Sequence, residues 1–561
     1  MSVADTLLSR KKISPEQLEK AKSARRGSER IEKCLVRLGY IKERDYLEVY
    51  GESLSIPVID LSQINIDEKL LKEFPTKAVH RYHLVPIARN NGTIKVATAN
   101  PFDLYAFDEL RMLTGSKIET VLATEEDIGR IIKKHFGVGG HTVEELVKEI
   151  GTDGIQIVSE REATDADMIE EAQEATVVKL VNEILVEAIR DRASDVHIEP
   201  YEHDLKIRYR IDGVLHTTNC PPEIRRFQNA IVSRIKILSN LNIAEKRLPQ
   251  DGGFKIKAQN RDIDLRVSII PAAFGEAVVM RILDKASALL SLTELGMIDP
   301  ALEGMNKLIA QPYGIILVTG PTGSGKTTTL YSALNTIKND TIKILTVEDP
   351  IEYYIDGIQQ VQTKARIGLT FAAGLRSFLR HDPDVILVGE IRDLETAEVA
   401  INASLTGHLV FSTLHTNDTV TANTRLLDMG VEPFLVSSSI SGVLAQRLVR
   451  KLCPDCKEAY KPEMIDVPAD FQMQKGDKIY RAVGCRDCRH TGYRGRMGIF
   501  ELLMINDELR EMIVTRKSAG QMQDVARKKY GLQLMREDGW NKVRLGLTTI
   551  DEIVRVTQAV L

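Results

Sequence analysis

The stretch that decides the fold lies past the middle of the chain and reads Ile315-Ile316-Leu317-Val318-Thr319-Gly320-Pro321-Thr322-Gly323-Ser324-Gly325-Lys326-Thr327-Thr328. Its first residues form a short apolar run typical of a buried strand, and the remainder has the spacing G-x-x-x-x-G-K-[ST] that joins such a strand to a helix. Glycines let the backbone approach phosphate groups, and the backbone amides at the start of a helix face anions. Residues 320–328 are therefore predicted to form a phosphate-binding loop. Lys326 would neutralise the β- and γ-phosphates and Thr327 would bind Mg²⁺, which predicts a site for ATP or GTP.

A second apolar run, residues 385–388, ends in Gly389 and Glu390. An acidic residue at the tip of a strand beside a phosphate loop is typical of the Walker B position, which faces the metal ion. Glycine stands here where that motif usually has aspartate. We therefore assign the metal-binding role to Glu390.

A third apolar run, residues 344–347, is followed by the acidic segment Glu348-Asp349-Pro350-Ile351-Glu352. Because the ends of parallel strands meet at one edge of a sheet, these carboxylates are expected near the same phosphate site as Glu390. One of them could orient the attacking water, and Glu352 is our candidate. We interpret Glu348 as a solvated loop carboxylate.

The chain has 561 residues, a length that exceeds what a single hydrophobic core can organise. Its composition is that of a globular protein. A formal net charge of −4 offers no broad basic field of the kind that attracts nucleic acid. The sequence shows neither an apolar run of about 18–20 residues nor the charged-then-apolar order of a secretory signal. We therefore expect a multidomain cytoplasmic protein that binds no nucleic acid and does not cross a membrane.

The N-terminal segment, residues 1–136, is expected to be an α+β domain. It has a helix start at Ser14-Pro15-Glu16-Gln17, with a capping side chain and proline in the first turn. Farther on, two strand-like runs flank Asn91-Gly92, a dipeptide that closes hairpins because both residues tolerate positive φ. Nothing in this segment resembles catalytic chemistry, so we assign it a docking role toward partner proteins.

Three further segments follow. Residues 137–174 combine glycines with many acidic residues, which is typical of a flexible linker. Residues 175–285 begin with apolar residues at helical spacing and continue with alternating runs, which predicts a small α/β domain. Residues 286–561 predict a larger α/β domain in which strands, loops and helices alternate around the phosphate loop.

Two C-x-x-C pairs lie in the C-terminal segment, within an element of about residues 450–495: Cys453, Cys456, Cys485 and Cys488. Each pair can present two thiolates from one tight turn, and four sulfur ligands suit tetrahedral Zn²⁺. With four protein ligands the site would be closed, so we predict a structural zinc ion. Cys34 and Cys220 have no such partners and are interpreted as small buried residues.

Four signatures together resemble the secretion ATPase superfamily, which powers type II secretion and type IV pilus assembly. They are the phosphate loop, the acidic segment 348–352, the segment Gly389-Glu390-Ile391-Arg392-Asp393 and a histidine-containing segment from Gly407-His408 to Leu414-His415-Thr416. The resemblance implies a RecA-like P-loop ATPase domain preceded by a smaller, PAS-like α/β domain. It also implies a homohexamer that hydrolyses ATP with Mg²⁺, peripheral at the inner membrane through platform and cytoplasmic-domain partners.

The resemblance also implies roles for single residues. In that family the carboxylate that matches Glu352 activates water, and the one that matches Glu390 holds Mg²⁺ through water. The histidines that match His408 and His415 sense the phosphate or couple it to movement. The residues by themselves would favour two ordinary histidines at strand ends.

Arginines form the last part of the expected site. Residues 194–200 and 208–213 resemble the family's second N-terminal domain, whose arginines approach the phosphates. This implies Arg210 and, with a less direct alignment, Arg208 and Arg225. The ATPase domain would add Arg376 and Arg380. Each arginine could instead form a surface salt bridge, and the sequence leaves that alternative open.

The leading interpretation is a hexameric motor for protein export by a type II secretion system, with type IV pilus assembly as the alternative. The cysteine element and the long N-terminal segment favour export or assembly, because the shorter retraction members of the family lack both. Residues 428–435 and 442–447 look more like type II secretion members. A ring helicase or DNA-packaging ATPase is a remote alternative without the expected basic, aromatic-rich groove. A scaffold that binds ATP without turnover is disfavoured by Lys326, Glu352 and Glu390.

Some relatives bind cyclic di-GMP through a duplicated N-terminal motif with Arg-Leu-Gly at the head and Gln at the tail of each half. Here Arg37-Leu38-Gly39 occurs once and in a different frame. The first half has neither Arg-Leu-Gly nor the final Gln. The sequence therefore argues against binding of the dinucleotide by residues 1–136.

Overall fold

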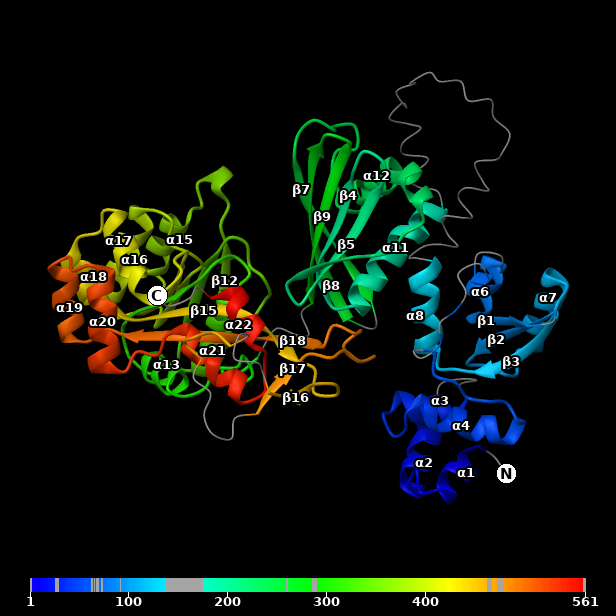
Figure 1. The fold of residues 1–561 in the computed structure, drawn as a ribbon. Helices are drawn as coiled ribbons and strands as arrows, with labels where there is room; N and C mark the ends of the chain where they lie inside the picture. The colour runs from blue at the N-terminus through cyan, green and yellow to red at the C-terminus, as the bar shows by residue number, and fades with distance from the viewer. Residues whose placement is uncertain are drawn as a thin grey trace. The chain divides into compact units, whose positions relative to one another are not determined.

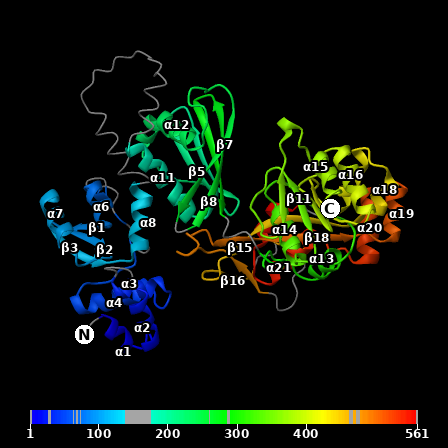
Figure 2. The same ribbon diagram turned by 180° about the vertical axis from the view of Figure 1, so that it is seen from behind.

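The computed structural model describes residues 3–25, 30–61, 64, 66, 70–71, 74–90, 92–136, 175–258, 261–284, 290–461, 467–471 and 478–557. The predicted linker, residues 137–174, lies outside them. The chain divides into an N-terminal unit, Met1–Ala258 with Asp264–Ile282, and a C-terminal unit, Gln259–Ile263 with Leu283–Leu561. Figures 1 and 2 show the chain from opposite sides. In the described part, no helix combines the length and apolarity that a membrane span requires.

The N-terminal unit begins with four helices around a small apolar core: α1 (Val3–Ser9), α2 (Pro15–Ser23), α3 (Ile31–Arg37) and α4 (Glu43–Leu54). The predicted capping box is present, since the Gln17 N–H donates to Ser14 Oγ and the Ser14 N–H donates to the Gln17 side chain at 2.9 Å. Pro15 takes the first helical position, where its missing N–H has no partner to lose. The helix start was thus predictable from four residues.

A three-stranded sheet follows in the order β1-β2-β3. Strands β1 and β2 are antiparallel with Asn90 opposite Thr93, which confirms the hairpin predicted at Asn91-Gly92. Strands β2 and β3 are parallel and are connected through α7. The elements are α6 (Thr76–Tyr82), β1 (Leu84–Asn90), β2 (Thr93–Thr98), α7 (Leu104–Thr114), β3 (Lys117–Leu122) and α8 (Glu125–Phe136).

The rest of the N-terminal unit is a six-stranded sheet in the order β6-β5-β4-β9-β8-β7. Helix α11 packs against β4 and against α12, as Figure 1 shows. The elements are α11 (Ala175–Arg190), β4 (Ala193–Pro200), β5 (Leu205–Ile211), β6 (Val214–Thr217), the short 3-10 helix η2 (Pro222–Phe227), α12 (Gln228–Leu238), β7 (Gln250–Ala258), β8 (Arg261–Ala272) and β9 (Gly275–Asp284).

The C-terminal unit is built on a seven-stranded sheet in the order β12-β11-β13-β14-β10-β15-β18. All neighbours in it are parallel except β15 and β18. Its first elements are α13 (Ala301–Ile309), β10 (Gly314–Thr319), α14 (Lys326–Ile337), β11 (Ile344–Glu348), β12 (Gln359–Gln362), η4 (Ala365–Ile367), α15 (Phe371–Phe378), β13 (Val385–Val388), α16 (Leu394–Leu405) and β14 (Leu409–Leu414).

The remaining elements complete the unit and add a small two-stranded sheet, β16-β17. They are α17 (Thr419–Asp428), α18 (Pro433–Ser439), β15 (Ile440–Leu452), β16 (Glu458–Tyr460), β17 (Ile479–Arg481), β18 (Tyr493–Met504), α19 (Asp507–Val514), α20 (Ala519–Tyr530), α21 (Met535–Arg544) and α22 (Ile550–Val556).

Helices cover both faces of the seven-stranded sheet (Figure 1). One core cluster joins Ile316 and Val318 of β10 to residues of α13 and α14, and another joins Ile315 and Leu317 to residues of α15, α16 and α17. Every residue of β10, β13 and β14 is buried, as expected for parallel strands covered on both sides. This confirms the predicted α/β class and brings the carboxyl ends of β10, β11, β13 and β14 to one edge.

Candidate active site

The phosphate-binding loop connects β10 to α14 as predicted. Gly320 has a φ of 143°, and a Cβ at this residue would lie 2.4 Å from the Gln446 carbonyl oxygen on β15. Only glycine can therefore stand at the start of the loop. Thr327 and Thr328 are half-buried in the first turn of α14, with Thr327 next to Lys326.

Lys326 folds back over this loop. Its Nζ donates to the carbonyl oxygens of Gly320, at 2.8 Å, and Pro321, at 3.1 Å. Burial lowers the pKa of Lys326, and the nearby Glu390 carboxylate acts in the opposite direction. Ser324 Oγ is buried and has no hydrogen-bond partner among the described residues. A lysine ammonium and an orphaned hydroxyl beside the loop fit a bound phosphate group.

Glu390 is the centre of the second part of the site. Its side chain is 13% exposed and forms an ion pair with Arg392 on the same loop. His415, which follows β14, places its Nε2 3.3 Å from the other Glu390 carboxylate oxygen. The hydrogen bond to Glu390 raises the pKa of Arg392, to which Asp349 adds a smaller contribution. Loops from three strands thus bring charged groups to one edge.

The close contacts around Gly389 favour glycine over the usual aspartate at this position. A Cβ at this residue would lie 3.3 Å from Glu348 Cα, from the Val347 carbonyl oxygen and from the Phe371 ring. Its backbone N–H donates to that same Val347 oxygen at 2.8 Å. The chain after β13 therefore packs directly on the end of β11, and the next residue, Glu390, supplies the carboxylate.

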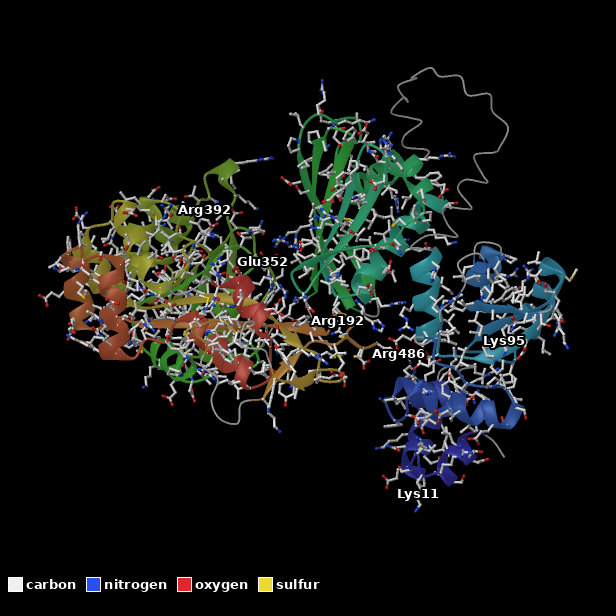
Figure 3. All side chains as sticks on the ribbon, in the orientation of Figure 1. Lys11, Lys95, Arg192, Glu352, Arg392 and Arg486 are labelled. Atoms are coloured by element: carbon white, nitrogen blue, oxygen red, sulfur yellow. The ribbon has the colours of Figure 1, made fainter. Side chains whose placement is uncertain are left out.

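The interpretation of Glu348 as a solvated carboxylate is wrong. Its side chain ends β11 inside the unit, where the residue is 3% exposed. Its carboxylate accepts hydrogen bonds from Tyr331 Oη, from Thr346 Oγ1 at 2.6 Å and from Gln360 Nε2 at 3.2 Å. Glu352, four residues later, is half-buried in the loop that follows β11; Figure 3 labels it, together with Arg392.

The structure separates the two predicted histidines. His415 follows the carboxyl end of β14, but His408 precedes its first residue, and the His408 carbonyl accepts from the Gly314 N–H at the start of β10. A strand of this length spans about 20 Å. His408 therefore lies at the opposite edge of the sheet from the phosphate loop, with its Nδ1 2.8 Å from the Ala403 carbonyl oxygen.

The loop that carries His415 is fixed to the strand of the phosphate loop. The Thr416 N–H donates to Thr319 Oγ1 at 2.9 Å, and Thr319 Oγ1 donates to the Leu414 carbonyl at 3.1 Å. Thr319 is the residue before Gly320. His415 and the phosphate loop are therefore joined through one buried threonine.

Four of the five predicted arginines form contacts within their own units. In the N-terminal unit, Arg208 forms an ion pair with Glu199 at 2.6 Å, and Arg210 Nε lies 3.8 Å from Asp195. Arg225 is half-buried in η2.

In the C-terminal unit, Arg376 pairs with Glu395 at 2.8 Å, and Arg380 donates to the Arg376 carbonyl at 3.0 Å. Neither arginine contacts the phosphate loop among the described residues. Arg392, to which the sequence pattern assigns no role, is instead the arginine at the Glu390 carboxylate. Its position two residues after Glu390 was the available signal.

The four predicted metal ligands come together between β15 and β18. Their Sγ atoms all lie within 4.8 Å of one another. Three of the pairs, Cys453–Cys485, Cys456–Cys488 and Cys485–Cys488, are separated by 3.7 Å. Zn–S bonds of about 2.3 Å place the sulfurs of a tetrahedron about 3.8 Å apart, so the spacing fits zinc.

Backbone amides support the same cluster. Cys488 Sγ accepts from the N–H groups of Cys485, at 3.1 Å, and Gly492, at 3.2 Å, and Cys456 Sγ accepts from the Gly484 N–H at 3.3 Å. Donors of this kind stabilise thiolate rather than thiol, which is the form that binds metal. The donor set therefore suits a closed structural site.

Replacing Cys485 with serine should remove bound zinc and loosen the loop before β18. We expect about one zinc ion per chain in the parent protein and a melting temperature at least about 5 °C lower in the variant, because metal binding stabilises the folded loop. Elemental analysis and thermal unfolding measure both. Cys220→Ser, which lies outside the cluster, should retain the metal; equal zinc content in all three proteins would contradict the assignment.

Two family models match the chain. The model described as "Type II/IV secretion system protein" matches residues 170–555, and the model described as "MshEN domain" matches residues 54–142. The first covers more than half of the chain and includes the whole site described above.

Relatives from type IV pilus assembly and from type II secretion are similar to this chain over nearly its full length. The chain is 45% identical to "Type IV pilus assembly ATPase PilB" of Myxococcus xanthus, over 97% of this chain and 96% of that protein. It is 42% identical to "Type II secretion system protein E" of Xanthomonas campestris pv. campestris, over 99% of this chain and 98% of that protein. The X-ray structure of the Legionella pneumophila ATPase DotB, 22% identical, covers 67% of this chain and 95% of its own, with a TM-score of 0.50, and so shares the fold.

Proposed function

Since the chain belongs to the ATPases of the type II/IV secretion system family, we propose that it hydrolyses ATP at the edge formed by β10, β11, β13 and β14 to drive a secretion or pilus machine. The observation that carries this proposal is the meeting of Lys326, Glu390 and His415 beside the phosphate loop. The segments that follow three separate strands supply them, an arrangement that suits phosphoryl transfer.

Each group at this edge has a role in the proposal. The phosphates of ATP lie in the loop 320–328, against the helix start and Lys326. Thr327 and Glu390 would hold Mg²⁺, which would neutralise charge at the phosphates when it is bound. Glu352 orients the attacking water and accepts its proton. His415 contacts Glu390 and reports on the state of the phosphate site.

We extend the proposal to the assembly. When the edge strand β12 is left out, the parallel strands β10, β11, β13, β14 and β15, numbered in chain order, have the spatial order 5-1-4-3-2, which supports a RecA-like core. The chain would act as a homohexamer, peripheral to the cytoplasmic face of the inner membrane, with the PAS-like domain bringing Arg210 to the nucleotide. Arg210 would then have to leave Asp195, 3.8 Å away, and the buried Asp195 carboxylate would keep Arg281 as a partner at 3.0 Å.

Deleting the gene should identify the machine. A pilus assembly ATPase and a type II secretion protein are similar to the chain over nearly its full length and at similar identity. We therefore expect either loss of protein release into the medium or loss of surface pili. Secreted protein and surface filaments are measured in the same deletion strain. Complementation with Glu352→Gln should fail, whereas a strain with both processes intact would contradict the proposal. ATP turnover that rises with added DNA would favour the helicase alternative.

A further inference from the structure

Four buried or half-buried polar side chains lie beside the loop of Glu352, and the proposed nucleotide chemistry does not use them. They are Tyr331, Thr346, Glu348 and Gln360, of which the first three are at most 3% exposed. Tyr331 comes from α14, the helix that begins with Lys326, and the others come from β11 and β12. The group therefore lies between the phosphate-loop helix and the acidic segment.

Glu348 is the centre of this group. One carboxylate oxygen accepts from Tyr331 Oη, and the other accepts from Thr346 Oγ1 and Gln360 Nε2. Burial, with the Glu348 charge as a second cause, raises the pKa of Tyr331, so its hydroxyl keeps its proton and donates it. A buried carboxylate is tolerated only when hydrogen bonds replace water, and here three donors do so.

The same side chains hold the acidic loop by its backbone. The Glu352 N–H donates to Tyr331 Oη. Gln360 Nε2 donates to the Tyr353 carbonyl at 3.1 Å, and the Ile355 N–H donates to Gln360 Oε1 at 2.7 Å. The rings of Tyr331 and Tyr353 meet edge to face with centroids 4.6 Å apart. The backbone is thus held at Glu352 and on its C-terminal side.

We infer that Tyr331, Glu348 and Gln360 are positioning residues that fix Glu352 relative to the phosphate loop. Tyr331 is the tie, because it belongs to the helix started by Lys326 and contacts the Glu352 backbone. The inference rests on the proposed function, in which Glu352 orients water. A displacement of about 1 Å of a catalytic group can cost about 100-fold in rate, so such a tie has a measurable effect.

Tyr331→Phe removes the tie and keeps the ring. We expect kcat for ATP hydrolysis to fall by about 10- to 100-fold, because Glu352 is no longer held, whereas KM and affinity for a fluorescent ATP analogue change less than about twofold. Phosphate release, equilibrium titration and thermal unfolding of the full chain measure these quantities. Tyr493→Phe is the matched control, since it removes a tyrosine hydroxyl bonded to Thr549 in the same unit and should leave turnover unchanged.

Gln360→Met is a second variant that tests the same inference if Tyr331→Phe does not fold. It removes the bonds to the Tyr353 carbonyl and to the Ile355 N–H from a half-buried strand position. A fall of about 5- to 10-fold in kcat at unchanged ATP affinity is expected. Parent-like kcat in whichever of the two variants folds would overturn the inference.

A double-mutant cycle separates positioning from general damage. In the Glu352→Gln background, Tyr331→Phe should cause no further loss of kcat, because the group it positions is already absent. A further loss by the full factor of the single variant would overturn the inference while leaving the role of Glu352 intact. Parent-like turnover of Glu352→Gln itself would overturn the proposed role of Glu352, and the inference with it.

Discussion

Lys326→Ala will abolish nucleotide binding. The ammonium donates to the carbonyls of Gly320 and Pro321 beside the helix start. Burial lowers its pKa because the charged form has lost water, and a bound phosphate group would replace that lost solvation. Removal of a charged hydrogen-bonding partner of the phosphates should weaken ATP affinity at least about 100-fold and bring turnover to background. Equilibrium titration with a fluorescent ATP analogue measures the affinity directly.

The control for this variant is Lys307→Ala. Lys307 is an exposed lysine on α13 in the same unit, so its removal changes net charge equally without touching the loop. It should bind ATP like the parent protein. If Lys326→Ala retained affinity within about threefold, the phosphate loop would not be the nucleotide site.

Glu352→Gln will bind ATP normally and lose hydrolysis. The substitution keeps the shape of the side chain and removes the carboxylate that orients water and accepts its proton. We expect kcat to fall by about 100- to 10,000-fold with affinity unchanged within about twofold. Titration and phosphate release on the same preparation separate the two effects.

Asp356→Asn offers a matched control from the same loop. Asp356 is exposed, and its backbone carbonyl, which the substitution leaves in place, accepts from Lys338 Nζ at 2.8 Å. Its variant should hydrolyse ATP at the parent rate, which excludes a general effect of lost negative charge. Equal turnover in Glu352→Gln and the parent would instead transfer the role of base to another carboxylate, with Asp349 as the next candidate.

Local patterns predicted those parts of the fold and site that local chemistry decides. The strand, loop and helix around residues 315–328 were predictable because one short stretch contains an apolar run, a set of glycines and a helix start. The Ser14 capping box and the hairpin that brings Asn90 opposite Thr93 are local in the same sense. The cluster of four cysteines was also predictable, because two closely spaced cysteine pairs suggest a tetrahedral metal site.

The remaining parts depend on tertiary contacts that no short pattern contains. The prediction for Glu348 is wrong because its donors Tyr331 and Gln360 lie on a helix and an edge strand that are separate from β11 in the sequence. His408 and His415 share one strand, but only the topology shows that they lie at its opposite ends. The role of Arg392 depends on its ion pair with Glu390, which no short sequence pattern contains.

The close packing of Gly389 on the end of β11 has an evolutionary consequence. Restoring the usual aspartate there would not recreate the ordinary motif, because its Cβ would press on the Glu348 backbone and the Phe371 ring at 3.3 Å. The spacing of the two neighbouring strands therefore favours the carboxylate one residue downstream. A return to the common form therefore requires small movements of these neighbours as well as the substitution, and a search for aspartate at that position would overlook the proposed metal-binding residue.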